Sequence, residues 1–196
     1  LMNGGTIDAS QVRQLICGNQ VTAILMEDGT IYAWGNDGLA ATNLSSIIKH
    51  GKKESKLEKL VFTNDGLYGI DANGTFVCGK STKYNLISVT DENGRNVSTD
   101  IFEYIGDRKV VDIAASGNAL ALVLDDGEIV VSGIKEPQPQ LLEGENAVTV
   151  SGGTRHFVLT TDQGRVYAWG QSFRNQCDIP AALTREGAVD TVYASG

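Results

Sequence analysis

Three observations in the sequence predict an all-β fold built of repeated units. A glycine turn, Asp-Gly in its clearest form, stands between two β-rich runs, which is the strongest short-range signal of a hairpin. This layout occurs four times, in residues 12–35, 57–79, 110–133 and 147–170, and each turn glycine lies 17 residues after the first run begins. A second glycine follows six residues later, or five in the second copy. Shared spacing indicates one structural unit repeated along the chain.

The period of the repeats predicts a β-propeller. The copies start at residues 12, 57, 110 and 147, and a fifth start at residue 189 completes periods of 45, 53, 37 and 42 residues. Short strands at such periods are typical of propeller blades. We expect one partial propeller domain over residues 1–196, with blades at 12–56, 57–109, 110–146 and 147–188 and the start of a fifth at 189–196. A seven-bladed ring of such blades needs about 300 residues. We therefore expect a segment of a longer protein, with a five-bladed ring as the alternative.

The first copy indicates how the strands of a blade are filled. Its first strand ends in the small residues 16–18, because a strand near the propeller axis has little room and glycine lets backbones approach closely. Trp34, and Trp169 in the fourth copy, are expected to be buried between adjacent blades. Cys17 and Cys78 are expected to be small buried residues.

The second copy carries the longest connection. Two β-rich runs, at residues 86–89 and 101–105, flank a polar segment at residues 91–96 that contains Asn-Gly. The pattern predicts either an extra hairpin or an outer strand with a long loop. Because connections vary while cores are kept, this insertion is a candidate interaction element.

The repeats resemble those of the regulator of chromosome condensation family. The resemblance rests on small-residue strands at residues 114–117 and 151–153 and on Gly-x-x-His at residues 153–156. It also rests on a glycine turn followed by Tyr-Ala-Trp-Gly at residues 32–35 and 167–170. The resemblance implies a β-propeller of four-stranded blades.

Further positions resemble the family or depart from it. Gln-Cys-Asp-Ile-Pro at residues 176–180 is similar to a loop that follows Trp-Gly in bacterial members. The family histidine is present only at His156, and Cys78 and Ser132 stand where the family has tryptophan.

Composition and motifs narrow the class of function. The net charge is −8 and the isoelectric point is about 4.7, so we expect no nucleic acid as a partner. No apolar run is long enough for a membrane span. Phosphate-binding loop motifs are missing, and the cysteines and histidines lack the spacing of metal ligands. Only His50 and His156 could serve a hydrolase triad. We expect no enzyme, no cofactor and no metal.

Candidate binding residues lie in three polar or aromatic segments. The first group follows Trp-Gly of the fourth copy, the second belongs to the basic cluster at residues 50–56, and the third lies in the polar part of the insertion. Aromatic and arginine side chains are enriched at interface hot spots. The residues are Phe173, Arg174, Asn175, Lys52, Lys53 and Arg95.

These observations predict a non-catalytic propeller module that presents its inter-strand loops to a protein partner. The resemblance implies guanine nucleotide exchange on a small GTPase as an alternative, with the insertion of the second copy as the active element. A structural component of a larger assembly, such as a virus particle, a toxin or a surface protein, is a further alternative. The expected partners are another protein and the remaining blades of the same polypeptide.

Overall fold

The computed structural model describes residues 7–18, 20–35, 48–49, 56–64, 66–78, 86–90 and 92–194, and nearly all of its regular structure is β-strand. The strands are β1 Val12–Gly18, β2 Val21–Met26, β3 Ile31–Gly35, β4 Ile48–Lys49, β5 Leu57–Phe62, β6 Leu67–Asp71, β7 Phe76–Cys78, β8 Leu86–Thr90, β9 Asn96–Asp100, β10 Val110–Ser116, β11 Ala119–Leu124, β12 Ile129–Ser132, β13 Ala147–Gly152, β14 His156–Thr161 and β15 Val166–Gly170. The short helical segments are η1 Ala9–Gln11, α2 Ile101–Ile105 and η2 Ala181–Leu183.

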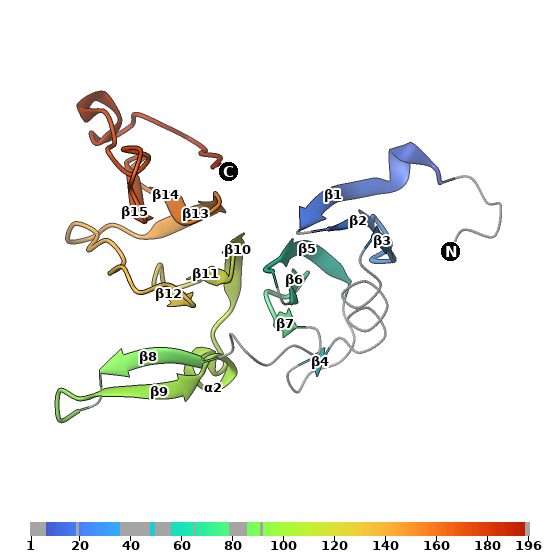
Figure 1. Cartoon of the computed structure of the whole chain (residues 1–196), viewed down its shortest axis with the longest axis horizontal. Helices are drawn as coiled ribbons and strands as arrows, with labels where there is room; N and C mark the ends of the chain where they lie inside the picture. Colours follow the sequence, from blue (N-terminus) through green and yellow to red (C-terminus); the bar gives the residue numbers. More distant parts are fainter. Residues whose placement is uncertain are drawn as a thin grey trace.

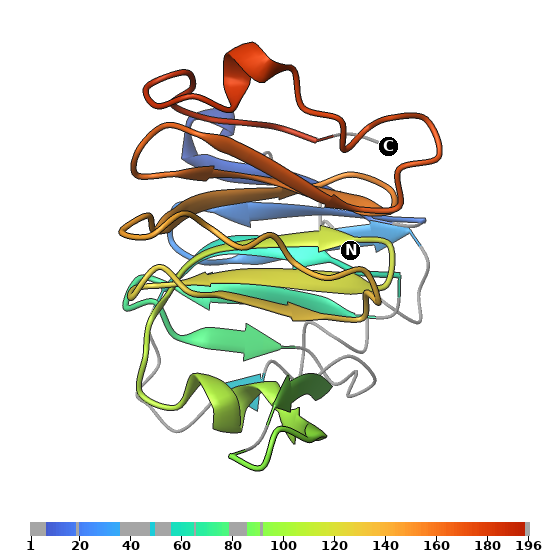
Figure 2. The same cartoon turned by 90° about the vertical axis from the view of Figure 1, so that its left-hand side faces the viewer.

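Four antiparallel sheets follow one another along the chain. Sheets 1, 3 and 4 have the orders β1-β2-β3, β10-β11-β12 and β13-β14-β15, and sheet 2 has the order β4-β7-β6-β5. We call β1, β5, β10 and β13 the inner strands, because they lie nearest the centre of the array while their sheets extend outward (Figure 1). Figure 2 shows the same sheets in successive layers. This radial arrangement confirms the predicted propeller fold.

A tight glycine turn joins the second and third strands of each sheet. In sheet 3, the Gly127 N–H donates to the Leu124 carbonyl at 2.9 Å, and Asp126 Oδ1 accepts from the Glu128 N–H at 3.1 Å. Gly127 has φ +82°, and the equivalent glycines of the other sheets have values between +70° and +87°. Because residues with a Cβ resist this left-handed conformation, glycine recurs at one fixed spacing.

The core lies between neighbouring sheets. Leu25 of sheet 1 and Leu60 of sheet 2 belong to one buried cluster. Phe157 and Trp169 of sheet 4 pack against the alanine-rich face of sheet 3, with their own ring centroids 5.2 Å apart. Each blade therefore buries its apolar face only because another blade lies next to it.

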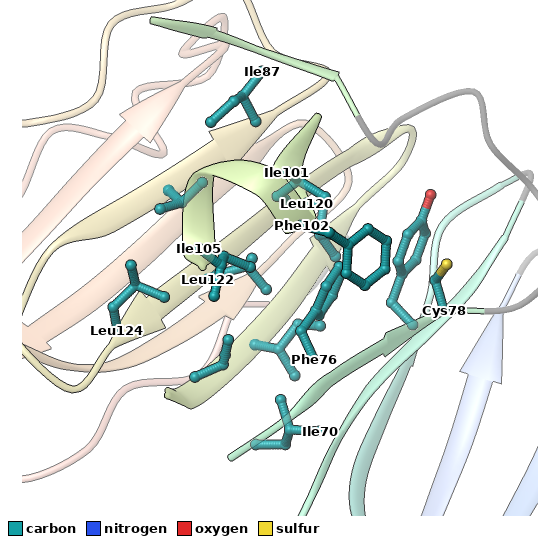
Figure 3. Packing of buried hydrophobic residues seen from close by; sticks show 14 residues of the cluster. Ile70, Phe76, Cys78, Ile87, Ile101, Phe102, Ile105, Leu120, Leu122 and Leu124 are labelled. Carbon is teal, nitrogen blue, oxygen red and sulfur yellow. The ribbon is translucent and has the colours of Figure 1, made fainter. Parts of the chain in front are cut away.

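A third cluster lies between sheets 2 and 3 and contains helix α2 (Figure 3). Asp100 caps this helix, since its Oδ1 accepts from the Phe102 N–H at 2.8 Å. Ile101, Phe102 and Ile105 are buried, and the Phe102 ring centroid lies 4.9 Å from that of Phe76. The insertion thus contributes to the core as well as to the surface.

The insertion itself forms the predicted hairpin, but with a different second strand. β8 pairs with β9 from Leu86 opposite Asp100 to Thr90 opposite Asn96. The prediction that residues 101–105 are a β-run is wrong, because their apolar side chains share one helical face and Asp100 caps the first turn. The Ser132 hydroxyl donates to the Leu86 carbonyl at 2.9 Å, which places the hairpin beside β12.

Two burial predictions are wrong at sheet 1. Trp34 is 46% exposed, whereas Trp169 at the equivalent place in sheet 4 is 5% exposed. Trp169 faces sheet 3, but among the described residues no sheet lies on the corresponding side of sheet 1. Cys17, on the opposite edge strand β1, is also exposed, while Cys78 is buried as predicted.

The predicted start of a fifth blade follows sheet 4 without forming a strand over residues 189–194. The Val189 N–H donates to the Gly164 carbonyl at 3.1 Å, and the Ala194 N–H donates to Ser151 Oγ at 3.0 Å. The segment therefore runs along sheet 4 back toward β13.

Candidate protein-interaction face

One end of the array is formed by turns at the ends of the inner strands. Asn64, Asn118 and Arg155 belong to the turns that leave β5, β10 and β13, and Lys135 and Gln171 follow β12 and β15. They surround a hollow of about 730 Å³. We call this surface the turn face.

Small residues let the strands under the turn face approach closely. A Cβ atom on Gly152 would lie 2.0 Å from the Ala115 carbonyl oxygen, and one on Gly18 would lie 2.7 Å from Phe62 Cβ. This confirms the crowding that was predicted from the small residues of the inner strands. Backbone and short side chains therefore line the inside of the hollow.

Hydrogen bonds fix the turns to one another. The Asn64 N–H donates to the Gly117 carbonyl at 2.8 Å, which ties the turn of sheet 2 to that of sheet 3. The Gln171 N–H donates to the Arg155 carbonyl at 2.9 Å, and Arg155 Nη1 donates to Gln171 Oε1 at 3.1 Å. The rim is thus held by backbone bonds between neighbouring elements.

The loop at residues 171–178 begins at this rim and is folded on itself. Ser172 Oγ accepts from the Cys177 N–H at 3.1 Å, and the Asp178 N–H donates to the Asn175 carbonyl at 3.0 Å. Asn175 has φ +61°, a conformation that asparagine tolerates better than most residues. The loop has few conformations to lose when a partner binds.

Phe173, Arg174 and Asn175 project from this one loop, and Phe173 is 83% exposed. Arg95 lies in the turn of the β8–β9 hairpin, which is far from sheet 4 and its following loop in both views (Figures 1 and 2). Lys52 and Lys53 lie outside the described residues. The structure therefore groups three of the six predicted binding residues.

The charge of the turn face is mixed in an otherwise acidic chain. Lys135 and Arg155 are exposed at the rim, and Arg174 is exposed on the loop. Glu136 and Asp178 stand close to them in the sequence. A partner with both acidic and basic groups would match this surface better than a polyanion would.

The environment of Cys177 disfavours nucleophilic chemistry. Burial raises the pKa of its thiol, and the carboxylates of Asp178 and Glu136 raise it further, against a lowering hydrogen bond with Ser172. A thiol with a raised pKa is a poor nucleophile at neutral pH. Over the described ranges, no three His, Cys, Asp or Glu residues gather as a metal site. No helix in that part of the chain combines the length and apolar character that crossing a membrane requires.

Sequence reasoning missed four rim residues, Asn118, Lys135, Arg155 and Gln171. Each is an ordinary polar residue in a loop, and its residue type alone does not indicate that it lies on the turn face. Their positions do give one, since they come directly after the small-residue strands or after the third strand of a copy. Aligning the copies by their glycines would have placed them on one end of the propeller.

Sequence comparisons point to one repeat family. Residues 147–176 match the model of the "Regulator of chromosome condensation (RCC1) repeat". The mouse "RCC1-like G exchanging factor-like protein" is 29% identical over 84% of this chain and 42% of its own length. "Protein pim1" of fission yeast is 25% identical over 94% of this chain and 41% of its own. The chain thus spans about two fifths of these relatives.

Solved structures agree in fold. Human WBSCR16 aligns with a TM-score of 0.63 at 19% identity, over 94% of this chain and 56% of that one. Prp20p from Saccharomyces cerevisiae aligns with a TM-score of 0.61 at 15% identity, over 97% of this chain and 55% of that one. With its repeated glycine turns and radially arranged antiparallel sheets, the chain shares the β-propeller fold of these structures, and its residues 147–176 match a regulator of chromosome condensation repeat.

Proposed function

We propose that this chain is a propeller module that binds another protein through the turn face and the loop at residues 171–178. The observation that carries the proposal is the 83% exposure of Phe173, next to Arg174, on a loop closed by its own hydrogen bonds. Exposed aromatic and arginine side chains on a rigid support are typical of binding hot spots.

The fold supports this use of the loop. The apolar residues of the sheets are taken up by inter-blade packing, so the surface available for specific recognition consists of turns and loops. A framework that does not rearrange lowers the entropy lost on binding. Recognition then depends on a few anchors and on the shape around them.

Site-specific photo-crosslinking tests the proposal. A photoreactive benzoylphenylalanine at position 173 should capture one protein from cells that express the chain, and the same residue at position 86 should not. Leu86 is the matched control because it is also an exposed apolar residue, at 56%, but lies on β8. With the captured protein purified, Phe173→Ala or Arg174→Ala should weaken the 1:1 complex about tenfold or more. Unchanged affinity in both variants would refute the anchor assignment.

Guanine nucleotide exchange is a second candidate function. The mouse and human relatives carry the name "RCC1-like G exchanging factor-like protein", and the chain spans 42% of each. The exposed β8–β9 hairpin is an element that could enter a partner's nucleotide site. Deleting residues 88–98 shortens the hairpin from the Ser88–Ser98 pair outward and leaves buried Ile87 and α2 in place, but it also removes Val89, which packs against the same cluster.

An exchange assay separates the two candidates. The chain is added in substoichiometric amounts to small GTPases loaded with fluorescent GDP, and release of the fluorescent GDP is followed in the presence of excess unlabelled GTP. Exchange activity predicts faster release that is lost when residues 88–98 are deleted and kept in Phe173→Ala. Release at the intrinsic rate for every GTPase tested would remove this candidate and leave the binding proposal standing.

A further inference from the structure

Two Asn-Gly pairs lie within the described residues, and their surroundings differ. Asn73–Gly74 is in the turn between β6 and β7, and Asn93–Gly94 is in the loop between β8 and β9. A third pair, Asn3–Gly4, lies outside the described residues. An asparagine side chain is readily attacked by the backbone nitrogen of a following glycine, because glycine has no Cβ to hinder the approach. The structure around each pair therefore decides whether this reaction can proceed.

Hydrogen bonds fix the turn that contains Asn73. The Asn73 N–H and the Thr75 N–H both donate to Asp71 Oδ1, at 2.8 and 2.9 Å. The Gly74 N–H, which contains the attacking nitrogen, donates to the Asp71 carbonyl at 2.9 Å. This bond must break before the nitrogen can lose its proton and attack, and leaving such a bond unmade is costly. The turn therefore holds the Gly74 nitrogen in an unreactive arrangement.

The same turn is also packed against the neighbouring blade. The Gly74 carbonyl accepts from the Val110 N–H at 2.8 Å, which joins sheet 2 to the first residue of β10. A Cβ atom on Gly74 would lie 2.8 Å from Lys109 Cβ. Ring closure requires the backbone of the pair to rotate, and here that rotation would disrupt the contact between sheets 2 and 3.

The loop that contains Asn93 has different surroundings. All residues from Glu92 to Arg95 are exposed, and a Cβ atom on Gly94 would meet no atom within 4 Å among the described residues beyond its chain neighbours. The loop lies beyond the last strand pair of the hairpin, Thr90–Asn96, and away from the four sheets (Figure 1). Loop tips open locally at little cost, because few contacts are broken. The backbone rotation that Asn73 resists is therefore accessible at Asn93.

We propose that Asn93 is a site of spontaneous deamidation and that the fold protects Asn73 from the same reaction. The Gly94 nitrogen attacks the side-chain amide carbon of Asn93, so that a C–N bond forms, the nitrogen loses its proton and the amide group leaves as ammonia. Water then opens the cyclic imide at either carbonyl, which gives aspartate or isoaspartate at position 93. Water is the only co-reactant. The inference is independent of the proposed binding function.

The reaction changes both the charge and the shape of the hairpin tip. A new carboxylate between Glu92 and Arg95 makes the net charge of the chain one unit more negative than −8. In the isoaspartate product the main chain runs through the former side chain, which adds one carbon atom to a turn in which Gly94 has φ +75°. We expect the adjoining Thr90–Asn96 pair to weaken in that product. The hairpin that is the candidate exchange element would therefore exist in chemically distinct forms.

Peptide mapping by mass spectrometry tests the proposal. The native chain is incubated in mildly alkaline buffer and digested with trypsin, which places the three Asn-Gly pairs in peptides of residues 1–13, 60–80 and 84–95. A sample digested without incubation gives the conversion that occurs during digestion, and fragment spectra locate the change within each peptide. Conversion at Asn93 should be about tenfold or more faster than at Asn73, because the Gly74 hydrogen bond must first break. Equal rates at the two positions, or no conversion at Asn93, would overturn the proposal.

Two controls separate the effect of the fold from that of the sequence. In guanidinium chloride, where the turns are unfolded, Asn73 and Asn93 should convert at similar rates. If Asn73 were as slow relative to Asn93 as in the native chain, the difference would come from local sequence, and the claim of protection by the fold would be overturned. Asn93→Gln keeps an uncharged amide but closes a larger ring slowly. Methylation of peptide 84–95 by protein isoaspartyl methyltransferase should therefore appear in the incubated parent and be lost in Asn93→Gln, and equal methylation of both would refute the assignment to Asn93.

Discussion

Replacing Trp169 tests whether packing between blades stabilises the fold. An aromatic side chain buries 150–250 Å², which at 25 cal/mol per Å² corresponds to about 4–6 kcal/mol. The indole N–H of Trp169 is buried and has no acceptor among the described residues, which offsets about 1–2 kcal/mol. We therefore expect Trp169→Ala to lower the free energy of unfolding by about 3–4 kcal/mol, within the usual range for such truncations.

Trp34 provides a matched control with the same residue type at the equivalent place. Because its side chain is 46% exposed and no described sheet covers it, Trp34→Ala should cost less than about 1 kcal/mol. Trp169→Phe should cost less than about 2 kcal/mol, since it keeps the stacking on Phe157 and removes the unpaired N–H. Urea unfolding followed by circular dichroism gives all three values. Equal losses for the two alanine variants would refute the inter-blade account.

Two further predictions concern the insertion and the connection to sheet 4. Phe102→Ala should lower the free energy of unfolding by about 3 kcal/mol in the same assay, because it removes the contact of α2 with the core. Glu103→Ala, at an exposed position of the same helix, should change it by less than about 0.5 kcal/mol. An unchanged free energy for Phe102→Ala would mean that α2 is not part of the core. Burial alone would raise the pKa of Glu145, but hydrogen bonds from Tyr167 and Arg165 outweigh this effect and lower the pKa below its ordinary value. The ionised carboxylate therefore stabilises the fold at neutral pH, and this contribution is lost as the pH falls through the lowered pKa. Glu145→Gln should therefore lie below the parent at neutral pH and approach it in acid, and a difference independent of pH would contradict this assignment.

The parts of the fold that the sequence predicts are those set by local conformation. Glycine at the turn before the third strand is required by positive φ, as at Gly127, and so the repeat is visible in the sequence. The small residues near Gly152 are required by its close approach to the Ala115 backbone. The turn glycine acts within one repeat and is present in every copy, whereas the second copy has Phe62 where the others have Cys17, Ala115 and Gly152.

The features that the sequence does not predict depend on which sheets lie next to a residue in the propeller. Trp34 and Trp169 stand in nearly identical sequence, yet one is exposed and the other buried. Residues 101–105 have high β-propensity, yet they form a helix because Asp100 caps it and two sheets cover its apolar face. The Asp100 cap is a local signal, but burial by tertiary neighbours decides both outcomes and is not contained in any local pattern.

The candidate site shows the same division. Phe173 and Arg174 could be selected by residue type, because exposed aromatic and arginine side chains have few structural uses in a loop. Arg155 and Lys135 could not, since they come together only where turns from separate blades meet around one hollow. A propeller places turns of distant sequence on a common surface, and its framework residues repeat while its surface residues do not. The surface residues that differ from copy to copy are therefore where partner choice can be encoded without altering the fold.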